Sequence, residues 1–396
     1  MRLVICDYSG HPFQVELSRA LAARGHHVLH LYFKEFETPH GNLVDDMPRL
    51  KIIPVTIGRP FDKMNFLKRR PVEQSVGGFM GAYAADFNAD VVVACNMPID
   101  SHLRLRSVCR RRHGKAPAFV FWHQDIYSHA IYHYLSAKLG MLGRLIGRYY
   151  QHLEAQLART SAAVIPISTK FLPQLMQWHV DEEKISVIPN WAPLGEIYPV
   201  NKDNAWAREH GLVDKKVALY TGTLGLKHDP ALLVDLAKAG AGIGLHVVVV
   251  SQGAAATWLN EQSINNLIVL PFQPIERYPE VLGTGDVMLA MIGEEAAGFS
   301  IPSKILSYLA AGKPVVAAIK SDNDAAVTVE RADAGVIVAP GDYSGFVRSV
   351  FGLVQDAEMC TTYARNARQY AEREFAIDQI AGRFENVFND AVRGKR

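Results

Sequence analysis

The alternation of short apolar runs with helical segments, which occurs twice along the chain, constrains the fold more than any other feature. In the first half we predict strands at 3–6, 27–32, 51–55, 91–94, 119–122 and 164–167. After Trp191 the pattern restarts, with strands predicted at 216–221, 246–251, 267–270, 287–291, 315–318 and 335–338. Strands that alternate with helices form parallel sheets with helices on both faces. The sequence therefore predicts an α/β protein with two parallel sheets in series.

The segments between and after these strands carry helix and linker signals. Residues 13–24 show helical spacing of apolar residues and are followed by Gly25, a typical C-cap. The tail at 343–392 is helical in pattern throughout. The join between the two repeats contains three prolines, Pro189, Pro193 and Pro199. Two sheets joined in this way predict two domains with a cleft between them, and ligands at the carboxyl ends of the strands.

Composition excludes several other classes of protein. The 396 residues fit two or three domains of ~150 residues, and 49% hydrophobic with 21% charged residues excludes disordered, collagen-like and coiled-coil chains. The longest apolar runs are far shorter than the ~20 residues that span a bilayer, and the start lacks the ~7–15-residue apolar segment of a secretory signal. No C-x-x-C spacing occurs, which favours a reducing cytoplasm over a disulfide or metal framework. The cysteines are Cys6, Cys95, Cys109 and Cys360.

Charge is distributed unevenly. Residues 1–190 contain 23 Lys and Arg against 16 Asp and Glu, a net charge of +7, and the remainder carries −5. Basic residues cluster at 68–70 and 104–115, and again at Lys138, Arg144 and Arg148. They indicate either solvated helix faces or attraction to an anionic lipid or acceptor. Nucleic acid is disfavoured as a partner, because no recognition motif accompanies the basic residues.

Two segments have the chemistry of an anion site. Residues 220–227 run from a strand through Gly222 to Lys227, so that backbone N–H groups and an ammonium can approach a phosphate. Residues 298–317 place Ser303 and Lys304 at the start of a helix. The alternative for both is an ordinary strand-to-helix turn with a surface lysine.

Other nucleotide and catalytic motifs are missing. Gly240, Gly242 and Gly244 follow a predicted helix and precede a strand, which is the wrong context for the G-x-G-x-x-G fingerprint. The sequence contains no Walker loop, H-E-x-x-H or G-x-S-x-G motif. A nicotinamide-dependent dehydrogenase is therefore disfavoured.

The sequence resembles the family 4 glycosyltransferases of the GT-B fold, over essentially the whole chain. It is most similar to the branch that builds bacterial capsule, colanic acid and O-antigen, which includes N-acetylfucosamine transferases. The resemblance is carried by residues 302–314, 220–227, 187–191 and 122–127. It implies two Rossmann-like domains. Residues 1–192, with a last helix at about 376–396 that crosses back, would bind the acceptor, and residues 193–375 would bind a nucleotide sugar.

The resemblance also implies roles for single residues of the donor site. The family's diphosphate loop and second phosphate contact fall on Gly222, Thr223, Lys227, Ser303 and Lys304. Gly10 lies in a loop near the donor phosphate, and Phe272 begins the segment that contacts the base. The two family glutamates that are spaced E-x7-E are replaced by Phe299 and Ser307, and Glu294 or Glu295 is the candidate substitute for the first.

On the acceptor side, the resemblance implies that His123 or Asp125 orients or deprotonates the acceptor. His129 and His133 lie near them, and a metal site is conceivable from these ligand types. We favour the interpretation that His129 and His133 lie on a helix face and bind no metal, since GT-B enzymes commonly work without metal.

The resemblance implies transfer of a sugar, with retention of configuration, from a UDP- or GDP-linked donor to a lipid-linked saccharide in surface polysaccharide biosynthesis. We expect a cytoplasmic protein at the inner face of the cell membrane. Residues 132–159 form an amphipathic, basic helix whose apolar side contacts either the membrane surface or the core of its own domain. The alternatives are a non-catalytic nucleotide-sugar-binding subunit, an inverting transferase and a GT-B sugar-nucleotide epimerase.

Overall fold

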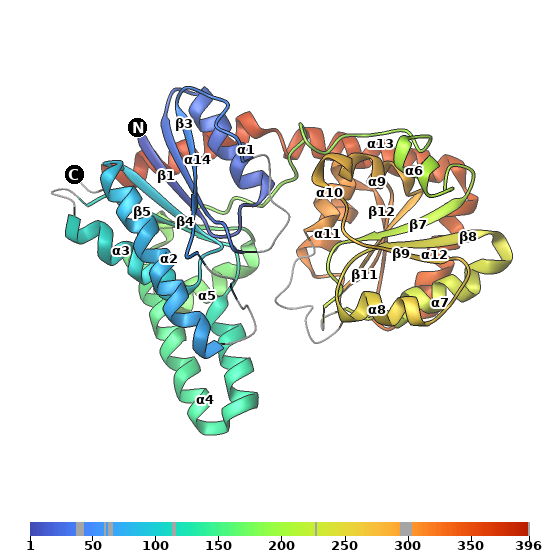
Figure 1. Ribbon diagram of the computed structural model, residues 1–396, viewed down its shortest axis with the longest axis horizontal. Helices are drawn as coiled ribbons and strands as arrows, with labels where there is room; N and C mark the ends of the chain where they lie inside the picture. The colour runs from blue at the N-terminus through green and yellow to red at the C-terminus, as the bar shows by residue number, and fades with distance from the viewer. Residues whose placement is uncertain are drawn as a thin grey trace. The chain divides into compact units, whose positions relative to one another are not determined.

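The computed structural model describes residues 1–36, 43–58, 61, 66–112, 116–225, 228–293 and 303–394. The chain divides into two compact units (Figure 1). Unit 1 comprises Met1–Asn190 together with Ile377–Arg396, and unit 2 comprises Trp191–Ala376. The division falls in the proline-rich join, and the C-terminal segment from Ile377 belongs to unit 1.

Unit 1 is a parallel sheet covered by helices. Its strands are ordered β3-β2-β1-β4-β5-β6. The strands are β1 (Arg2–Asp7), β2 (His27–Phe33), β3 (Leu50–Val55), β4 (Val91–Cys95), β5 (Ala118–His123) and β6 (Ala163–Pro166). The helices are α1 (Pro12–Ala23), α2 (Phe66–Asp86), α3 (Ile99–Arg112), α4 (Tyr127–Thr160), α5 (Leu172–Gln177) and α14 (Ile377–Arg393). All six predicted strands of this half are present, with bounds that differ by one or two residues.

The central strands have no solvent-facing side, which explains their unbroken apolar sequence. Leu3 to Cys6 of β1 and Val91 to Cys95 of β4 are buried throughout, as parallel strands between two helical layers require. One face of the sheet packs on α2, where Val76 contacts the same core as Val4. On the other face Trp122 of β5 packs on Phe384 of α14, with ring centroids 4.7 Å apart.

α14 is held in unit 1 by an apolar stripe at helical spacing. Ile380, Phe384, Phe388 and Ala391 are buried, and α14 lies beside α1 and β5. Burial of a Phe side chain contributes ~1.5–3 kcal/mol. The last helix therefore belongs to the first sheet, although most of the chain separates them in sequence.

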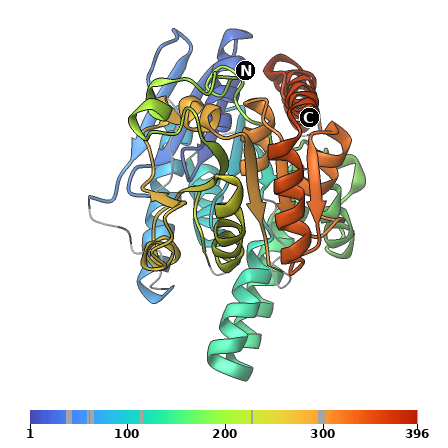
Figure 2. The same ribbon diagram turned by 90° about the vertical axis from the view of Figure 1, so that its right-hand side faces the viewer.

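α4 corrects the sequence prediction of a single continuous helix. The chain leaves helical geometry at Gly140 (φ 56°, ψ −127°) and turns back on itself. A Cβ on Gly143 would lie 1.9 Å from the carbonyl oxygen of Leu135, and one on Gly147 would lie 2.7 Å from Cα of Tyr132. The two arms are therefore antiparallel and closely packed. We call residues 127–160 the α4 hairpin; in Figures 1 and 2 it extends beyond the rest of unit 1.

Unit 2 repeats the architecture of unit 1. Its strands are ordered β12-β11-β10-β7-β8-β9. They are β7 (Lys216–Thr221), β8 (Leu245–Val250), β9 (Leu267–Leu270), β10 (Val287–Met291), β11 (Val315–Ala318) and β12 (Gly335–Val338). The helices are α6 (Ala205–Glu209), α7 (Ala231–Gly240), α8 (Ala254–Glu261), α9 (Tyr278–Thr284), α10 (Lys304–Ala310), α11 (Asp324–Ala332), α12 (Tyr343–Gln355) and α13 (Ala357–Glu374). The predicted bounds are confirmed for every strand except β8, which is shifted by one residue.

The predicted helical tail is confirmed, with two interruptions. α12 ends before Asp356, whose side chain accepts a hydrogen bond from Met359 N and so caps α13. Phe375 and Ala376 then separate α13 from α14. In the part of the chain that the structure describes, no helix is both long and apolar enough to cross a bilayer.

Candidate functional site

Both sheets have a topological switch point beside their first strand. β1 lies between β2 and β4, and β7 lies between β8 and β10. Ligands of such sheets bind at the carboxyl ends of the strands where the order reverses. The loops that follow β1 and β7 are therefore the places where each unit presents polar groups to a ligand.

In unit 2 the loop after β7 meets the start of α10. Gly222 follows β7 with φ +103°, a conformation that favours glycine. A Cβ on Gly222 would lie 3.4 Å from Lys304 Cε and 3.5 Å from Nζ, so the lysine lies against the loop backbone. Lys304 Nζ also lies 3.6 Å from the centroid of the Tyr220 ring, a cation–π distance. The fold thus places a positive charge on the glycine loop.

Hydroxyl groups behind this loop fix its position. Tyr308 Oη accepts a hydrogen bond from Thr221 N at 3.1 Å and donates one to the Leu289 carbonyl at 3.2 Å. Tyr278 Oη lies 3.2 Å from Thr221 Oγ1 and hydrogen-bonds the Ser307 side chain. Burial raises the pKa of both tyrosines, so their hydroxyls remain protonated donors. The network holds the end of β7 against α10, the two elements that form the site.

The other predicted donor residues have mixed outcomes. Thr223 and Ser303 are exposed, and the Thr223 carbonyl accepts a hydrogen bond from Tyr220 Oη at 3.1 Å. Several predicted residues lie outside the described residues, and their roles stay predictions. These are Lys227, Glu294, Glu295, Phe299 and Pro302.

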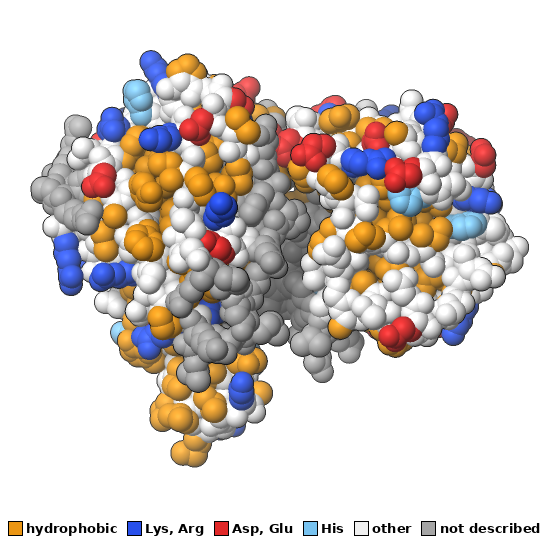
Figure 3. Space-filling view, in the orientation of Figure 1, with side chains coloured by type: hydrophobic (Ala, Val, Ile, Leu, Met, Phe, Trp, Pro, Cys, Tyr) orange, Lys and Arg blue, Asp and Glu red, His pale blue; other side chains and the backbone are white. Residues whose placement is uncertain are grey.

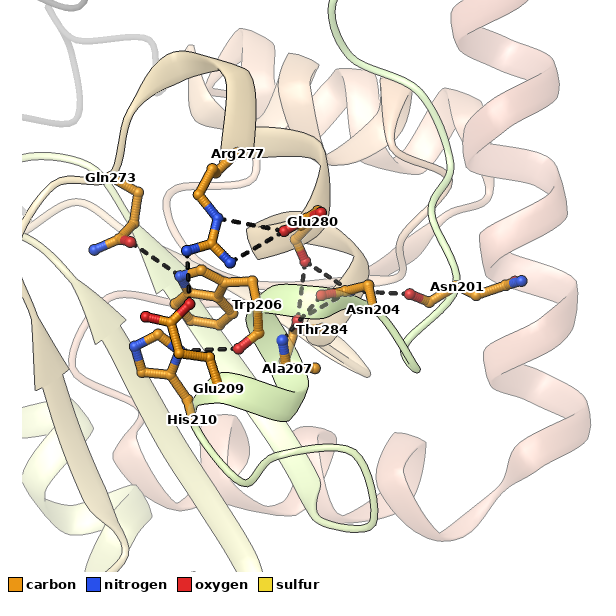
Figure 4. A network of polar contacts seen from close by, with 10 residues as sticks. All are labelled: Asn201, Asn204, Trp206, Ala207, Glu209, His210, Gln273, Arg277, Glu280 and Thr284. Atoms are coloured by element: carbon orange, nitrogen blue, oxygen red, sulfur yellow. Dashed lines mark hydrogen bonds and ion pairs between the residues drawn. The ribbon is translucent and has the colours of Figure 1, made fainter.

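The loop after β9 is fastened to α6 (Figure 4). Trp206 Nε1 donates to Gln273 Oε1 at 3.0 Å, and beside it Arg277 Nη1 forms an ion pair with Glu209 at 2.7 Å. Trp206 is fully buried, whereas Phe272 is exposed. In the segment that the resemblance assigns to the base, Gln273 is therefore held to α6 and the neighbouring Phe272 faces solvent.

In unit 1 the loop after β1 is built around a buried carboxylate. Asp7 Oδ1 accepts a hydrogen bond from Ser9 N at 3.0 Å, and Oδ2 accepts one from His11 N at 2.7 Å. Gly10, with φ +72°, makes the turn possible, and its N–H also interacts with Asp7. Burial raises the pKa of Asp7 to about 7, while these N–H groups act in the opposite direction. The N–H groups of the Gly10 loop therefore point toward Asp7.

Two further buried polar side chains lie behind Asp7. His30 Nε2 is 3.8 Å from Asp7 Oδ2, and His30 Nδ1 is 2.8 Å from Ser18 Oγ. Burial lowers the pKa of His30 to about 3, so the ring is neutral at physiological pH. The interaction with Asp7 is accordingly not an ion pair between full charges.

His123, a predicted acid–base residue, is fully buried at the end of β5. Its Nε2 lies 3.5 Å from Glu154 Oε1. Three aromatic rings have centroids within 6 Å of the imidazole centroid, those of Phe121, Phe171 and Trp178. A fully buried imidazole presents no surface to a substrate, so its burial supports a positioning role.

Glu154 connects His123 to the start of the α4 hairpin. Its carboxylate accepts hydrogen bonds from Tyr127 N at 3.1 Å and Ser128 N at 2.9 Å. A negative charge at a helix N-terminus is stabilised by the unpaired N–H groups and the helix dipole. The buried carboxylate thereby holds the loop that carries Asp125 in place.

Asp125 is exposed, in contrast to its neighbours. Gln124 and Asn190 form two amide hydrogen bonds, of 3.0 and 2.7 Å, which join the two sequence motifs that contain them. His129 is half-buried and burial lowers its pKa, whereas His133 is exposed. Asp125 and His133 are thus the exposed members of this group, and Asp125 lies just after the end of β5.

A pocket of ≈ 360 Å³ opens in unit 1 beside this loop. Its wall combines aromatic and aliphatic side chains with two arginines and two carboxylates. Tyr150 Oη donates to Asp100 Oδ2 at 2.6 Å, and Arg70 Nε lies 3.1 Å from Asp100 Oδ1. The other lining residues that matter here are Arg69, Tyr127, Ile131 and Tyr134. Arg69 likewise pairs with Glu73, so both guanidinium groups already have a carboxylate partner in the pocket wall, and the aromatic faces are the part of the wall suited to a sugar ring.

Family models match most of the chain. Residues 11–191 match the glycosyl transferase 4-like domain, and residues 215–356 match glycosyl transferases group 1. The chain belongs to glycosyltransferase family 4. The curated relatives include the Escherichia coli (strain K12) protein WcaI, named as a colanic acid biosynthesis glycosyl transferase, which is 24% identical over 63% of this chain and 63% of its own length. Bacillus subtilis (strain 168) YtcC, named as a glycosyltransferase, is 23% identical over 48% of this chain and 49% of its own.

The matched segment thus spans less than two thirds of each curated relative. Solved structures of other glycosyltransferases share the fold over nearly the whole chain. Sucrose-phosphate synthase from Thermosynechococcus elongatus has a TM-score of 0.73 at 16% identity and covers 98% of both chains. Anabaena HepE in complex with UDP-glucose has a TM-score of 0.69 at 17% identity, and covers 98% of this chain and 99% of its own. These neighbours confirm the GT-B fold predicted for this glycosyltransferase.

In this glycosyltransferase the structure brings Gly222 and Lys304 together, as the phosphate hypothesis requires. Sequence reasoning missed three residues that build the loops: Asp7, Glu154 and Tyr308. Only Asp7 carried a signal, because an acidic residue directly follows an apolar run that ends at a turn. Arg106, predicted as part of a basic surface cluster, is instead buried and donates to Thr160 Oγ1 at 2.9 Å.

The histidines near Asp125 do not assemble a metal site in the part of the chain that the structure describes. Within those ranges no group of three or more His, Cys, Asp or Glu side chains could hold a metal ion. The expectation that catalysis needs no metal stays a prediction.

Proposed function

We propose that this chain transfers a sugar from a nucleoside diphosphate sugar to a saccharide acceptor in bacterial surface polysaccharide biosynthesis, with retention of configuration. The observation that carries the proposal is the contact between Lys304 and the Gly222 loop at the switch point of unit 2. UDP-glucose bound to HepE, and the name of WcaI, support a nucleotide-sugar donor and a polysaccharide product.

The geometry suits the charge that develops during such a transfer. Cleavage of the bond between sugar C1 and the phosphate oxygen leaves a nucleoside diphosphate, whose negative charge grows in the transition state. Lys304, held against Tyr220, provides a preorganised positive charge at the glycine loop, and one well-placed donor of this kind contributes ~3–4 kcal/mol. We propose that Thr223, Ser303 and Lys227 complete the phosphate contacts and that Phe272 and Ser307 contact the nucleoside.

On the acceptor side we propose that Asp125 orients or deprotonates the attacking hydroxyl. Asp125 is exposed, and the buried His123–Glu154 pair, 3.5 Å apart, keeps its loop in place. The neighbouring pocket of ≈ 360 Å³ would hold a sugar of the lipid-linked acceptor against its aromatic side chains. In the loop after β1 we propose that Gly10 contributes the turn and not a phosphate-binding N–H group, because the N–H groups of that loop are directed at Asp7.

A thermal-shift screen against UDP, GDP and dTDP and their sugar conjugates tests the donor assignment. A ligand at 100 times its dissociation constant adds ~2.7 kcal/mol of stability, which a melting curve resolves. We expect one base to stabilise the protein, and incubation of that nucleotide sugar with undecaprenyl-diphosphate-linked saccharides to release the nucleoside diphosphate.

The outcomes of this screen separate the alternatives. Binding without release on any lipid-linked acceptor would favour a non-catalytic subunit, and interconversion of free nucleotide sugars would favour an epimerase. The anomeric configuration of the product, read by NMR, distinguishes retention from inversion. No stabilisation by any nucleotide would contradict the proposal as a whole.

A further inference from the structure

The far end of the α4 hairpin carries large apolar side chains that the protein does not cover. Met141 is 79% exposed, Leu145 61% and Leu142 59%, and these are the highest exposures among large hydrophobic side chains of the described residues. Leu139, on the other arm, is exposed as well. Figure 3 shows apolar side chains gathered at this end of the hairpin. The sequence left open whether these residues face the core, and the structure excludes that for all four.

The hairpin is packed against α3 at its base, so its exposed end is held in a fixed position on unit 1. Tyr150 and Leu157 of the second arm pack in one cluster with Ile99 of α3. The arms touch through glycines: a Cβ on Gly143 would overlap the Leu135 carbonyl at 1.9 Å. The close approach of the arms leaves the apolar side chains on the outside of the hairpin.

The charge of the hairpin has a single sign near its end. Residues 126–153 contain no Asp or Glu, whereas Lys138, Arg144 and Arg148 are all exposed. At 1.5 Å per helical residue, these cations lie ~3–12 Å behind the turn at Gly140. Basic side chains at that distance behind an apolar tip match the depth of ~5–10 Å to which interfacial helices enter the headgroup region.

Tyrosines lie farther from the turn than the aliphatic residues. Tyr134 and Tyr149 are exposed, six and nine residues from Gly140. Lys138 Nζ lies 5.7 Å from the centroid of the Tyr134 ring. Tyrosine collects at membrane–water interfaces, because its ring prefers apolar and its hydroxyl polar surroundings. The exposed aliphatic side chains thus lie within five residues of Gly140, with cations among and behind them and the tyrosines farther back, an arrangement suited to a surface that is apolar inside and charged at its boundary.

We propose that the end of the α4 hairpin inserts into the headgroup region of an anionic lipid bilayer. A second copy of the chain fits less well, since two such ends would bring cations together without a carboxylate partner. The insertion itself does not depend on the proposed function. Its consequence does rest on the proposed function: the enzyme would meet a lipid-linked acceptor at the membrane. Tyr134 also lines the pocket beside Asp125, so the hairpin leads from the bilayer to that pocket.

Sedimentation of the full chain with vesicles tests the insertion. We expect binding to phosphatidylglycerol–phosphatidylethanolamine vesicles and little binding to phosphatidylcholine vesicles. Arg144→Gln with Arg148→Gln should weaken the partition about 30-fold, at ~1 kcal/mol per cation near an anionic surface. Met141→Ser with Leu142→Ser should weaken it at least about tenfold, because less apolar area enters the bilayer. Met359→Ser and Arg365→Gln, at exposed positions on α13, are matched controls that should bind as wild type does.

Three further measurements keep the outcomes separate. All variants should keep the wild-type melting temperature and nucleotide affinity, since the changed side chains are exposed. In Met141→Trp, brominated lipids should quench fluorescence beyond the wild-type level. If the wild-type protein bound nucleotide but did not sediment with anionic vesicles, the insertion would be overturned and the proposed function would be left intact. A dimer in light scattering that the Met141→Ser and Leu142→Ser changes dissociate would assign the surface to a second copy instead.

Discussion

The two units share one strand order but place different ionisable groups beside the end of their first strand. β1 and β7 are both first strands of six residues, and each has a glycine of positive φ in the loop that follows it. In unit 1 the strand ends in Asp7, a buried carboxylate that draws the loop's N–H groups to itself. In unit 2 it ends in Thr221, and the loop beyond it lies against the Lys304 ammonium.

This difference shows why an identical topology does not make the halves equivalent. An anion at the switch point of unit 2 meets a cation, whereas at the switch point of unit 1 it would meet a carboxylate. The side chains at the ends of the strands, and not the sheet, decide which half suits a diphosphate.

Loss of the unit 2 cation should have the largest effect. Lys304→Met should lower turnover of the nucleotide sugar by about 10²–10³-fold, because the departing diphosphate loses a preorganised positive charge. Steady-state kinetics with the donor found in the thermal-shift screen would measure it. Lys238→Met, at an exposed position on α7, is the control. Near wild-type turnover of Lys304→Met would remove the contrast between the units.

Loss of the unit 1 anion should change the pH dependence of stability. The pKa of Asp7 is raised from 3.8 to about 7 in the folded protein, so the folded state binds the proton more tightly. The stability this contributes is present below the unfolded pKa and is lost as pH rises through 7. The unfolding free energy of wild type minus that of Asp7→Asn should therefore fall by about 2 kcal/mol between pH 5 and pH 7.

Urea unfolding of both proteins at several pH values would measure this difference. The comparison isolates Asp7, because His30 and His102 are common to both proteins. Burial lowers the pKa of each of these histidines to about 3, so they make both proteins less stable as pH falls. Parallel stability curves for the two proteins would show that Asp7 does not titrate in this range.

The smallest effect is expected at the glycine of the unit 2 loop. Gly222→Ala introduces a side chain at φ +103° and 3.4 Å from Lys304 Cε, which should weaken nucleotide binding about tenfold, from ~1–2 kcal/mol of strain. Gly244→Ala is the matched control, because Gly244 also has a positive φ, of +70°, and a Cβ there would meet nothing within 4 Å. Gly244 precedes β8, whereas Gly222 lies beside the last residue of that strand, Val250. The control should lower stability without changing nucleotide affinity. Equal affinities for the two variants would mean that the loop does not contact the nucleotide.

The periodic elements were predictable because their signals are local. Buried parallel strands need unbroken apolar runs, and helices end where glycine or a capping side chain allows it. β7, β9 and β10 accordingly have their predicted bounds. The α4 hairpin was missed because Gly140 alone is not a strong enough signal of a reversal, and the contact of Gly143 with Leu135 becomes visible only when the arms are folded.

The candidate site was predictable in its residue types and less so in their environment. Gly222 and Lys304 were singled out from their turns, yet their contact joins positions 82 residues apart. His123 was singled out as an acid–base group, and its burial follows from Phe121 on its own strand together with Phe171 and Trp178 beside α5. Burial is a property of packing, so an isolated motif does not reveal it.

The amino-acid sequence by itself determined the two parallel sheets, the glycine turns and the family, because apolar spacing and turn chemistry act over a few neighbouring residues. Tertiary structure alone decided which ionisable groups are hidden and which are presented. Asp7 and His123 became interior groups, while Lys304 was laid on a loop and Met141 was left at the end of a projection. The physical reason is that solvent access and charge proximity depend on segments distant in sequence, which only the packed chain brings together.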